Sequence, residues 1–394
     1  MELLKLTWKN MWHRKALVIL AMCTVAIATA FIVFIQLLND KIEQTAKEGY
    51  GPYELIVGKA GSDTQLMLHT FYHIGEPVGN IDFEVYEYVE KSPWQQAAFA
   101  MTRGDSYEGY PLIGVDPNYL SNRYPEAKMN GAIYSQAGEV VIGARVAKAL
   151  QLQIGDTFFA SHGEVHASHD EHEDAPFEVV GILSPLGTPD DQAIFTTLNY
   201  AWLLHDGEGM NSERGPITSI VIQPKGLMEL QQLAEQLNEF EDIQAIYSGK
   251  VVSSILSFVD TSRTFVYLIS MVAFIIALIA VMLVLLAVSL QRQKDIALLR
   301  LIGKSQKYIV TTIILEGVWI TLLGSLFGLM LGHLLTGILS SIIYEKFSVQ
   351  LDAFRVVPGE GWIVIFCMII GLFASIWPAI RAYRTDPLTL FHQG

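Results

Sequence analysis

The sequence predicts an α-helical membrane protein with four transmembrane helices and an α+β extracytoplasmic domain inserted between the first two. Four apolar runs are each long enough to cross a hydrocarbon core of about 30 Å, which takes about 20 helical residues. Of the 394 residues, 51% are hydrophobic and 17% are charged, whereas soluble domains carry about 25% charged residues. Most of the charge is gathered in one segment, residues 39–262.

The apolar runs set the boundaries of the predicted spans. These are residues 16–38, 265–290, 308–343 and 362–380. The third run is longer than one crossing, with Glu316 near its start and His333 inside it, so we place its crossing at 317–343. A buried core helix is the alternative for any single run, but four runs with charged flanks favour spans.

Residues 1–15 are predicted to form an interfacial elbow helix on the cytoplasmic side. One helical face collects apolar side chains, namely Leu4, Trp8, Met11 and Trp12. A simple extension of the first span is the alternative. The span itself could be read as a signal peptide cleaved after Ala30, but cleavage would leave the apolar run 31–35 as a new terminus, so we predict an uncleaved anchor.

The distribution of Lys and Arg predicts the orientation, because short loops rich in these residues stay cytoplasmic. Residues 1–15 hold four, residues 291–307 hold five, and the tail 381–394 adds two. Residues 39–262 hold 12 basic and 33 acidic residues, a net charge of −21, and the loop 344–361 holds only two basic residues. We therefore expect both termini inside and the large domain outside.

Charge and cysteine content exclude other classes. The formal net charge of −14 leaves no general basic surface for nucleic acid. Cys23 and Cys367 both lie inside apolar runs, so the outer domain must fold without a disulfide.

The outer segment mixes strand and helix patterns and shows no obvious internal repeat. Strands are predicted at 53–57, 139–142, 157–160, 177–183 and 219–222, and helices at 65–72 and 227–240. Residues 81–89 fit either a helix or a strand.

The basic segment 291–307 is predicted to contain a short amphipathic coupling helix that ends at Gly303, with Ile296, Leu299 and Ile302 at helical spacing. A solvated basic loop is the alternative. Residues 303–305, Gly-Lys-Ser, look like the end of a phosphate-binding loop, but that motif needs glycine where Leu298 stands, so we predict no nucleotide site in the chain.

Small residues in the third span indicate close helix packing. Gly324, Gly328 and Gly332 are four residues apart and share one helical face, which lets another backbone approach. The neighbour can be in the same chain or in a second subunit. Glu316 is expected to sit near the interface or face a partner, since it is costly in lipid.

Histidines are the most distinctive outer feature. The loop 162–174 holds five carboxylates and four imidazoles, those of His162, His166, His169 and His172. Such nitrogen and oxygen donors suit Zn²⁺, and a hairpin loop favours weak capture. His69 and His73, four apart on a predicted helix, could place two nitrogens on one face. A solvated insertion and a satisfied buried histidine are the respective alternatives.

Several motifs together resemble the MacB/FtsX-like permeases of ABC transporters. The stretch Gln291–Gly303 is similar to the signature after their second span, where a basic residue, an acid, an apolar pair, Arg and Gly follow in order. Residues 315–317 and 377–382 fit the same family, as do short stretches of the outer segment between Ile56 and Ile81. The order of one span before and three after a large domain extends the resemblance over nearly the whole chain.

The resemblance implies a permease subunit that pairs with a second copy and with two copies of a separate ATPase, which binds ATP and Mg²⁺. It implies mechanotransmission, in which the ATPases rearrange the outer domains rather than open a broad channel. By position it implies ATPase contacts at Asp295, Leu299, Arg300 and Gly303. It also implies a bacterial cytoplasmic (inner) membrane and a periplasmic domain.

The sequence does not identify the transported molecule. A transition metal such as zinc, a metal-carrying protein, a lipid, a lipoprotein or a peptide all fit, with a soluble or metal-binding outer partner. A membrane-anchored metal-binding sensor without a transport cycle is the alternative of another class. A metallohydrolase is disfavoured, because the residues between His69 and His73 lack the acid of the HExxH motif.

Overall fold

The computed structural model describes residues 2–162, 176–203, 215–347 and 351–384, and the chain divides into two compact units. The helical unit comprises Met1–Lys41, Asp260–Ile342 and Leu351–Gly394. The head unit comprises Ile42–Val259 and Ile343–Gln350. Each unit is built around its own hydrophobic core.

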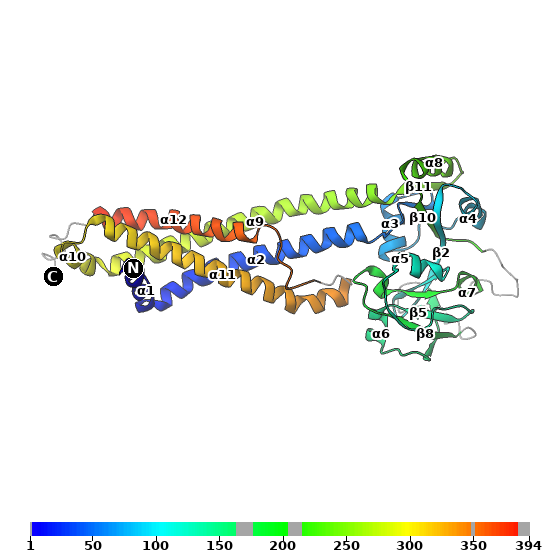
Figure 1. Ribbon diagram of the computed structural model, residues 1–394, viewed down its shortest axis with the longest axis horizontal. Coiled ribbons are helices and arrows are strands. Elements are labelled where there is room, and N and C mark those ends of the chain that lie inside the picture. The colour runs from blue at the N-terminus through cyan, green and yellow to red at the C-terminus, as the bar shows by residue number, and fades with distance from the viewer. Residues whose placement is uncertain (1, 163–175, 204–214, 348–350, 385–394) are drawn as a thin grey trace. The chain divides into compact units, whose positions relative to one another are not determined.

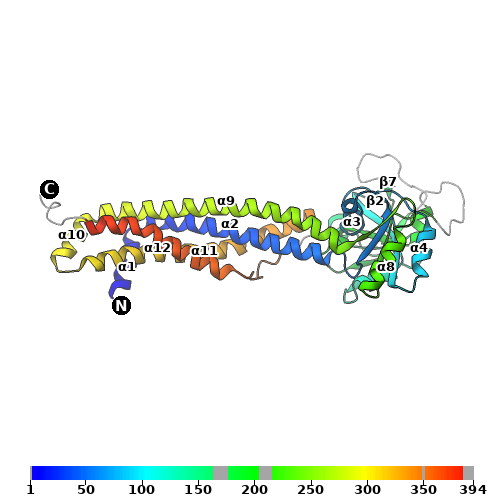
Figure 2. The same cartoon turned by 90° about the horizontal axis from the view of Figure 1, so that it is seen from above.

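The long helices form a bundle in the helical unit, where they run alongside one another in both Figure 1 and Figure 2. The helices are α1 (Glu2–His13), α2 (Lys15–Glu48), α9 (Ser248–Gln291), α10 (Gln293–Leu301), α11 (Gln306–Phe347) and α12 (Glu360–Arg384). Within the described residues, four candidate spans meet the length and hydropathy of a membrane crossing: Lys15–Glu48, Tyr267–Gln291, Gln306–Tyr344 and Glu360–Arg384.

The bundle buries small apolar side chains between its helices and exposes large apolar side chains on its outer surface. Ala21, Val281 and Ala374 are buried between the helices, whereas Phe327 and Phe373 are exposed. Large exposed apolar surface is unfavourable in water but suits lipid. The two cysteines are free, with Cys23 exposed and Cys367 buried.

Two of the span helices are longer than their apolar runs. The helix α2 continues to Glu48, and α9 begins at Ser248, well before the predicted span at residue 265. The helix α1 is a separate element that ends at His13, and only Arg14 separates it from the start of α2. Hydropathy marks only the part of a helix that suits lipid, so it leaves out the polar turns that continue the same helix.

The head unit is built on one mixed sheet. Its order in the described residues is β11-β1-β10-β2-β3-β9-β5-β8-β4, with β6 beside β8 and β7 beside β2. Most neighbours are antiparallel, but β3 with β9 and β5 with β8 are parallel. The strands are β1 (Leu55–Lys59), β2 (Gln95–Tyr107), β3 (Tyr110–Val115), β4 (Met129–Gly131), β5 (Glu139–Ile142), β6 (Thr157–Phe158), β7 (Ser161–His162), β8 (Phe177–Leu183), β9 (Ile194–Thr196), β10 (Ser219–Pro224) and β11 (Ile243–Tyr247).

Short helices cover both faces of this sheet. They are α3 (Asp63–Tyr72), α4 (Phe83–Glu90), α5 (Asn118–Arg123), α6 (Ala144–Leu150), the 3₁₀ helix η1 (Pro189–Gln192), α7 (Leu198–Leu203) and α8 (Leu227–Leu237). Along β1, Leu55 and Val57 join one core cluster with α4 and α8, while Ile56 joins another with α3 and α5. This alternation follows from the two-residue period of a strand.

The local predictions for the head unit hold in most places. The strands at 139–142 and 177–183 are confirmed residue for residue, and the helix expected at 65–72 is confirmed within α3. The undecided segment 81–89 is mostly helix α4. The strand expected at 53–57 lies two residues further along, as β1.

Candidate functional site

The expected coupling segment forms helix α10. Its inner face buries Ile296 against Ile309 of α11 and Ala379 of α12, and the neighbouring Ala297 is buried as well. The helix ends before Gly303, which adopts a φ of +91°, a left-handed conformation that L side chains rarely take. Burial of its inner face therefore holds this short helix against the bundle.

The opposite face of α10 exposes an apolar stripe. Leu298, Leu301 and Ile302 are 54%, 61% and 72% exposed, and their spacing places them on one face. We call these three residues the α10 stripe. Such an unpartnered apolar stripe on a short helix is suited to burial against another protein.

The four residues that the resemblance assigned to ATPase contact lie around this stripe. Asp295 and Gly303 are exposed, whereas Leu299 and Arg300 are half-buried. The sequence predicted Ile302 to lie on the same face as Ile296, whereas Ile296 is buried and Ile302 is exposed. The prediction missed Leu298 and Leu301, although positions 298, 301 and 302 have helical spacing. Apolar residues lie on more than one face of α10, and only the structure shows which face packs against the bundle.

A part-buried ion pair connects Arg292, the residue before α10, with the bundle. Arg292 Nη1 donates to Glu316 Oε1 over 2.9 Å, and Asn10 Nδ2 of α1 donates to the same oxygen over 3.1 Å. Arg14, just after α1, donates to the Val288 carbonyl oxygen over 3.0 Å. These contacts join α1, the end of α9 and the start of α11, and they satisfy the carboxylate that the sequence marked as costly in lipid.

A cavity of about 310 Å³ lies beside this ion pair. Leu285, Ile296 and Leu299 supply apolar walls, and Arg292 and Glu316 supply the polar ones. The half-buried Leu299 therefore belongs to a space that a neighbouring side chain can enter.

The glycines of the third span pack against α2 of the same chain. A Cβ atom added to Gly324, Gly328 or Gly332 would lie 2.9, 2.6 or 2.9 Å from the nearest atom of α2. Near Gly328 this atom is the carbonyl oxygen of Ala26 or the Cβ of Thr29. The structure thus gives these glycines a neighbour within the chain.

In the head unit, His69 and His73 have different surroundings. Helix α3 ends at Tyr72, and His73 follows as its cap in the left-handed conformation, with φ of 57°. The two imidazoles therefore do not extend from one regular helical face, as the sequence suggested. His73 Nε2 lies 2.8 Å from Asp190 Oδ1.

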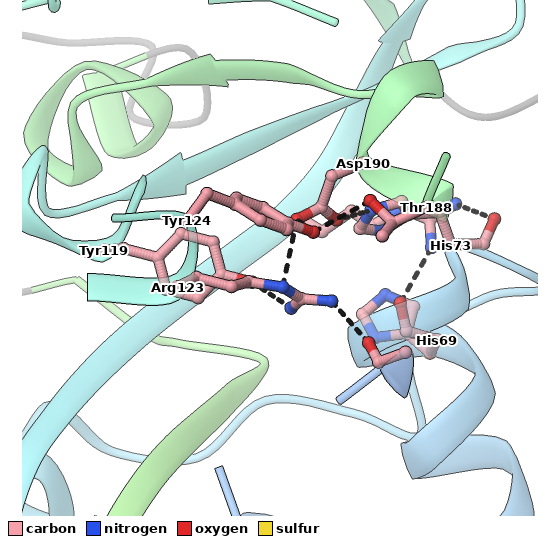
Figure 3. A network of polar contacts seen from close by, with 9 residues as sticks. His69, His73, Tyr119, Arg123, Tyr124, Thr188 and Asp190 are labelled. Atoms are coloured by element: carbon pink, nitrogen blue, oxygen red, sulfur yellow. Dashed lines mark hydrogen bonds and ion pairs between the residues drawn. The ribbon is translucent and has the colours of Figure 1, made fainter. Parts of the chain in front are cut away.

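Asp190 is the centre of a buried polar network, which Figure 3 shows. Its carboxylate accepts a hydrogen bond from Tyr124 Oη over 2.8 Å and lies 3.3 Å from Arg123 Nε. Arg123 also donates to the Tyr119 hydroxyl and to the Gly49 carbonyl oxygen. The network thus joins α5, η1, the end of α3 and the residue that follows α2.

The charges in this network follow from burial and pairing. Burial by itself raises the pKa of Asp190, but Arg123 and His73 outweigh it and bring the pKa below its ordinary value. Burial is the largest influence on His73 and lowers its pKa, although Asp190 opposes this. Asp190 is therefore a carboxylate, and the imidazole of His73 is neutral at pH 7.

His69 is buried without a partner. It is 2% exposed, and neither ring nitrogen has a hydrogen bond within the described residues. Burial, reinforced by Arg103 and His73, lowers its pKa to about 3. No group of three or more His, Cys, Asp or Glu side chains in the described parts of the chain is placed to hold a metal ion.

The loop histidines lie beyond what the structure describes. His166, His169 and His172 fall outside the described residues, and for His162 only the backbone, in β7, is described. Their metal role stays a prediction.

Comparison with known proteins matches both parts of the chain. The MacB-like periplasmic core domain matches residues 18–240, and the FtsX-like permease C-terminal domain matches residues 267–387. The chain belongs to the MacB/FtsX-like family of ABC transporter permeases. The predicted family is therefore confirmed, as is the fold class of four spans and an α+β domain.

The relatives of this permease are distant. It is 21% identical over 224 residues to an uncharacterised ABC transporter permease of Methanocaldococcus jannaschii, covering 55% of each chain. It is 31% identical over 98 residues to the macrolide export ATP-binding/permease protein MacB of Chlorobaculum tepidum, covering 25% of this chain and 14% of that protein. The chain thus spans about half or less of the length of these curated relatives.

Two solved structures are similar to the permease. The periplasmic region of MacB from Actinobacillus actinomycetemcomitans is 14% identical, with a TM-score of 0.35, and the match covers 52% of this chain and 94% of that one. The extracellular domain of the ABC-type transporter YknZ from Gram-positive bacteria is also 14% identical, with a TM-score of 0.31, and the match covers 49% of this chain and 98% of that one.

Proposed function

We propose that the chain is the transmembrane subunit of an ABC transporter and that its α10 stripe docks on a separate ATPase. The single observation that carries this proposal is that one face of α10 is buried against the bundle while its other face exposes apolar side chains. Ile296 fixes the helix to the bundle, while Leu298, Leu301 and Ile302 face outward without a partner in the described residues. Movement of an ATPase bound to this stripe would pass through α10 to the helices that it contacts, at the start of α11 and the end of α12.

The partner supplies the nucleotide chemistry in this proposal. The sequence lacks the first glycine of a phosphate-binding loop before Gly303, so ATP and Mg²⁺ would be bound by the ATPase. The assembly would contain two permease chains and two ATPase subunits, as the family resemblance implies.

The charge distribution supports a cytoplasmic position for α10. Nine Lys and Arg residues lie in 1–15 and 291–307 taken together, whereas 39–262 has a net charge of −21. We infer that both termini are cytoplasmic, that the head unit is outside, and that the membrane is a bacterial inner membrane.

Movement can reach the head through helices that both units share. Both α2 and α9 contribute residues to the helical unit and to the head unit. Packed helices move between discrete arrangements rather than deforming smoothly. We infer that ATP-driven closure of the ATPases shifts the bundle and changes the arrangement of the head, which is mechanotransmission.

Substitution of the stripe tests the docking. The Leu301→Glu chain, co-expressed with an ABC ATPase that co-purifies with the unsubstituted chain, should fold and insert but fail to co-purify with that ATPase. ATP hydrolysis should then fall to the level of the ATPase alone. Leu227→Glu, at a leucine that is 79% exposed in the head unit, is the matched control and should leave the complex intact. A Leu301→Glu complex with full activity would refute the docking surface. An unsubstituted chain that forms no complex with an ATPase would instead favour the alternative of a membrane-anchored sensor without a transport cycle.

Zinc handling is a second candidate, supported by the composition of the loop 162–174. Its four imidazoles and five carboxylates are suitable ligands for Zn²⁺. Calorimetric titration of the full chain with Zn²⁺ should show binding that is lost when all four histidines of this loop are replaced by Ala. Absence of binding in the unsubstituted chain would leave a lipid, a lipoprotein or a peptide as the proposed cargo.

A further inference from the structure

A second cavity, of about 520 Å³, lies inside the head unit. Its walls come from the end of α2, the end of α3, the turn between β2 and β3, η1 and the first turns of α9. Most of the lining is apolar, including Ile42, Ala46, Leu68, Val252 and Ile255. The volume falls in the range of about 300–1,000 Å³ that is usual for small-molecule sites.

The cavity has polar atoms without partners. The side chain of His73, which is 4% exposed, lines it, and its Nδ1 has no hydrogen bond within the described residues. Thr45 also lines the cavity, and its buried hydroxyl has no partner either. Buried polar groups in folded proteins are nearly always paired, so these two atoms are available to a molecule that enters the cavity.

The network around Asp190 fixes what His73 can offer. Asp190 is a carboxylate held by Arg123, and a carboxylate can only accept hydrogen bonds. His73 Nε2 must therefore carry the ring proton in the 2.8 Å contact with Asp190. In this neutral tautomer Nδ1 is an acceptor, and it requires a donor from the ligand.

The charge of the lining limits the ligand further. Among the described residues, those that line the cavity include no Asp, Glu, Lys or Arg. An anionic head group would meet an acceptor nitrogen and no Lys or Arg in the cavity wall, and a metal ion would find one imidazole in that wall without a carboxylate. A neutral molecule with a hydrogen-bond donor is the class that remains.

We propose that this cavity binds a neutral amphiphile, whose apolar body fills the space and whose hydroxyl or N–H group donates to His73 Nδ1. This inference goes beyond the proposed docking of an ATPase, because binding requires neither nucleotide nor partner. If the cavity binds no such molecule, the proposed docking of an ATPase on the α10 stripe is unaffected.

The direct test uses N-phenyl-1-naphthylamine, a fluorescent probe with an apolar body and one N–H group. The full chain in phosphatidylcholine nanodiscs should give a saturable fluorescence increase above that of empty nanodiscs. The N-methyl analogue, which lacks the donor, should bind roughly three- to tenfold more weakly, as expected for one lost hydrogen bond. Equal binding of the two probes, or a signal no larger than that of empty nanodiscs, would overturn the proposal.

Two variants locate the binding. Ala46→Phe adds a ring to the cavity wall and should weaken probe binding roughly tenfold or more, because overpacking is unfavourable. Lys47→Phe adds the same ring at the next position of α2, which is exposed and does not line the cavity, and should bind as the unsubstituted chain does. Unchanged binding by a folded Ala46→Phe chain would contradict the site.

Photolabelling gives a result that does not depend on any variant. A long-chain alcohol with a diazirine group, irradiated with the unsubstituted chain in the same nanodiscs, should leave adducts on residues 68–74 or 252–255. Adducts confined to the spans would contradict binding in the head unit.

Discussion

Among the described residues, the head unit and the helical unit each contain an Arg–carboxylate pair shielded from water, and these two pairs differ in how far they are removed from it. In the head, the side chains of Arg123 and Asp190 are 1% and 0% exposed. In the bundle, Arg292 and Glu316 are 17% and 5% exposed and line a cavity next to α10. One pair is enclosed by aromatic residues and hydrogen bonds, and the other lies where a partner is proposed to dock.

We infer from this difference that the head pair has a structural role and that the bundle pair takes part in the proposed coupling. Removal of one partner from a fully buried pair leaves an uncompensated charge, so the head network fixes its elements in one arrangement. The bundle pair is partly exposed beside a cavity, so in the proposed complex one of its members could pair with water or with a residue of the ATPase. We therefore expect substitutions in the head network to change stability, and substitutions in the bundle pair to change coupling.

The largest effect is expected for Arg123→Met. This change leaves the carboxylate of Asp190 buried without its cation, and it should destabilise the head by about 3–5 kcal/mol. Thermal denaturation of the full chain in nanodiscs, followed by tryptophan fluorescence, measures this loss. Lys148→Met, on the exposed side of α6, is the control and should melt as the unsubstituted chain does.

A double substitution checks the cause of that loss. Arg123→Met combined with Asp190→Leu removes both charges and should recover part of the stability lost by the single change. A double variant that is less stable than Arg123→Met would mean that packing, not the unpaired charge, dominates.

A smaller effect is expected where the bundle is packed most closely. Gly328→Ala places a methyl group 2.6 Å from the Ala26 carbonyl oxygen and should cost about 1–3 kcal/mol, measured by the same denaturation. Gly337→Ala is the matched control on the same helix, since its methyl group would meet only the Ala353 Cβ at 3.3 Å. Equal stability of the two variants would contradict the tight contact between α2 and α11.

The head should also lose stability in mild acid. His69 has an ordinary pKa of 6.5 and a pKa of about 3 in the folded head. The unfolded chain therefore binds a proton that the folded head excludes, so stability is complete above pH 6.5 and falls between pH 6.5 and about 3. At pH 5.5 the loss from His69 is about 1.4 kcal/mol.

Melting temperatures at pH 7.5 and 5.5 measure this loss. His69→Leu should make the difference between the two pH values smaller, whereas His13→Gln, at an exposed position of α1, should not. An unchanged pH dependence in His69→Leu would show that His69 does not contribute.

The smallest change in stability is expected for Arg292→Gln. The pair is partly exposed, and pairs near water contribute about 0–1 kcal/mol. The same variant should reduce ATP hydrolysis by the complex with the ATPase by more than its stability loss explains, because the anchor of α10 is weakened. Normal ATP hydrolysis by the Arg292→Gln complex would mean that the bundle pair, like the head network, has a structural role only.

The sequence predicted what depends on local pattern. The spans follow from long apolar runs, and β5 and β8 follow from short β-branched runs bounded by turn residues. The strand β2 was not predicted, since its 13 residues include Arg103 and Asp105, which are 9% and 4% exposed. Charged residues in a buried strand are stabilised only by partners that are distant in the sequence.

The candidate sites depend on such distant partners even more. Asp190 and Arg123 are 67 positions apart, and nothing near either one marks it as half of a buried pair. The pairing of Glu316 with Arg292 crosses from α11 to the residue between α9 and α10 in the same way. The sequence marked Glu316 as unusual because of its apolar surroundings but could not name its partner. It marked His73 for its spacing from His69, although a carboxylate 117 positions away determines its environment.

The central claim is that α10 lies beneath the membrane while the head lies beyond it, and maleimide labelling of single cysteines tests this most directly. One cysteine is placed at Ser305, next to α10, and the other at Met228 in the head; both positions are exposed. In intact spheroplasts a membrane-impermeant maleimide should label the cysteine at 228 and leave the one at 305 unlabelled until the membrane is permeabilised. Labelling of both from the same side would contradict the account.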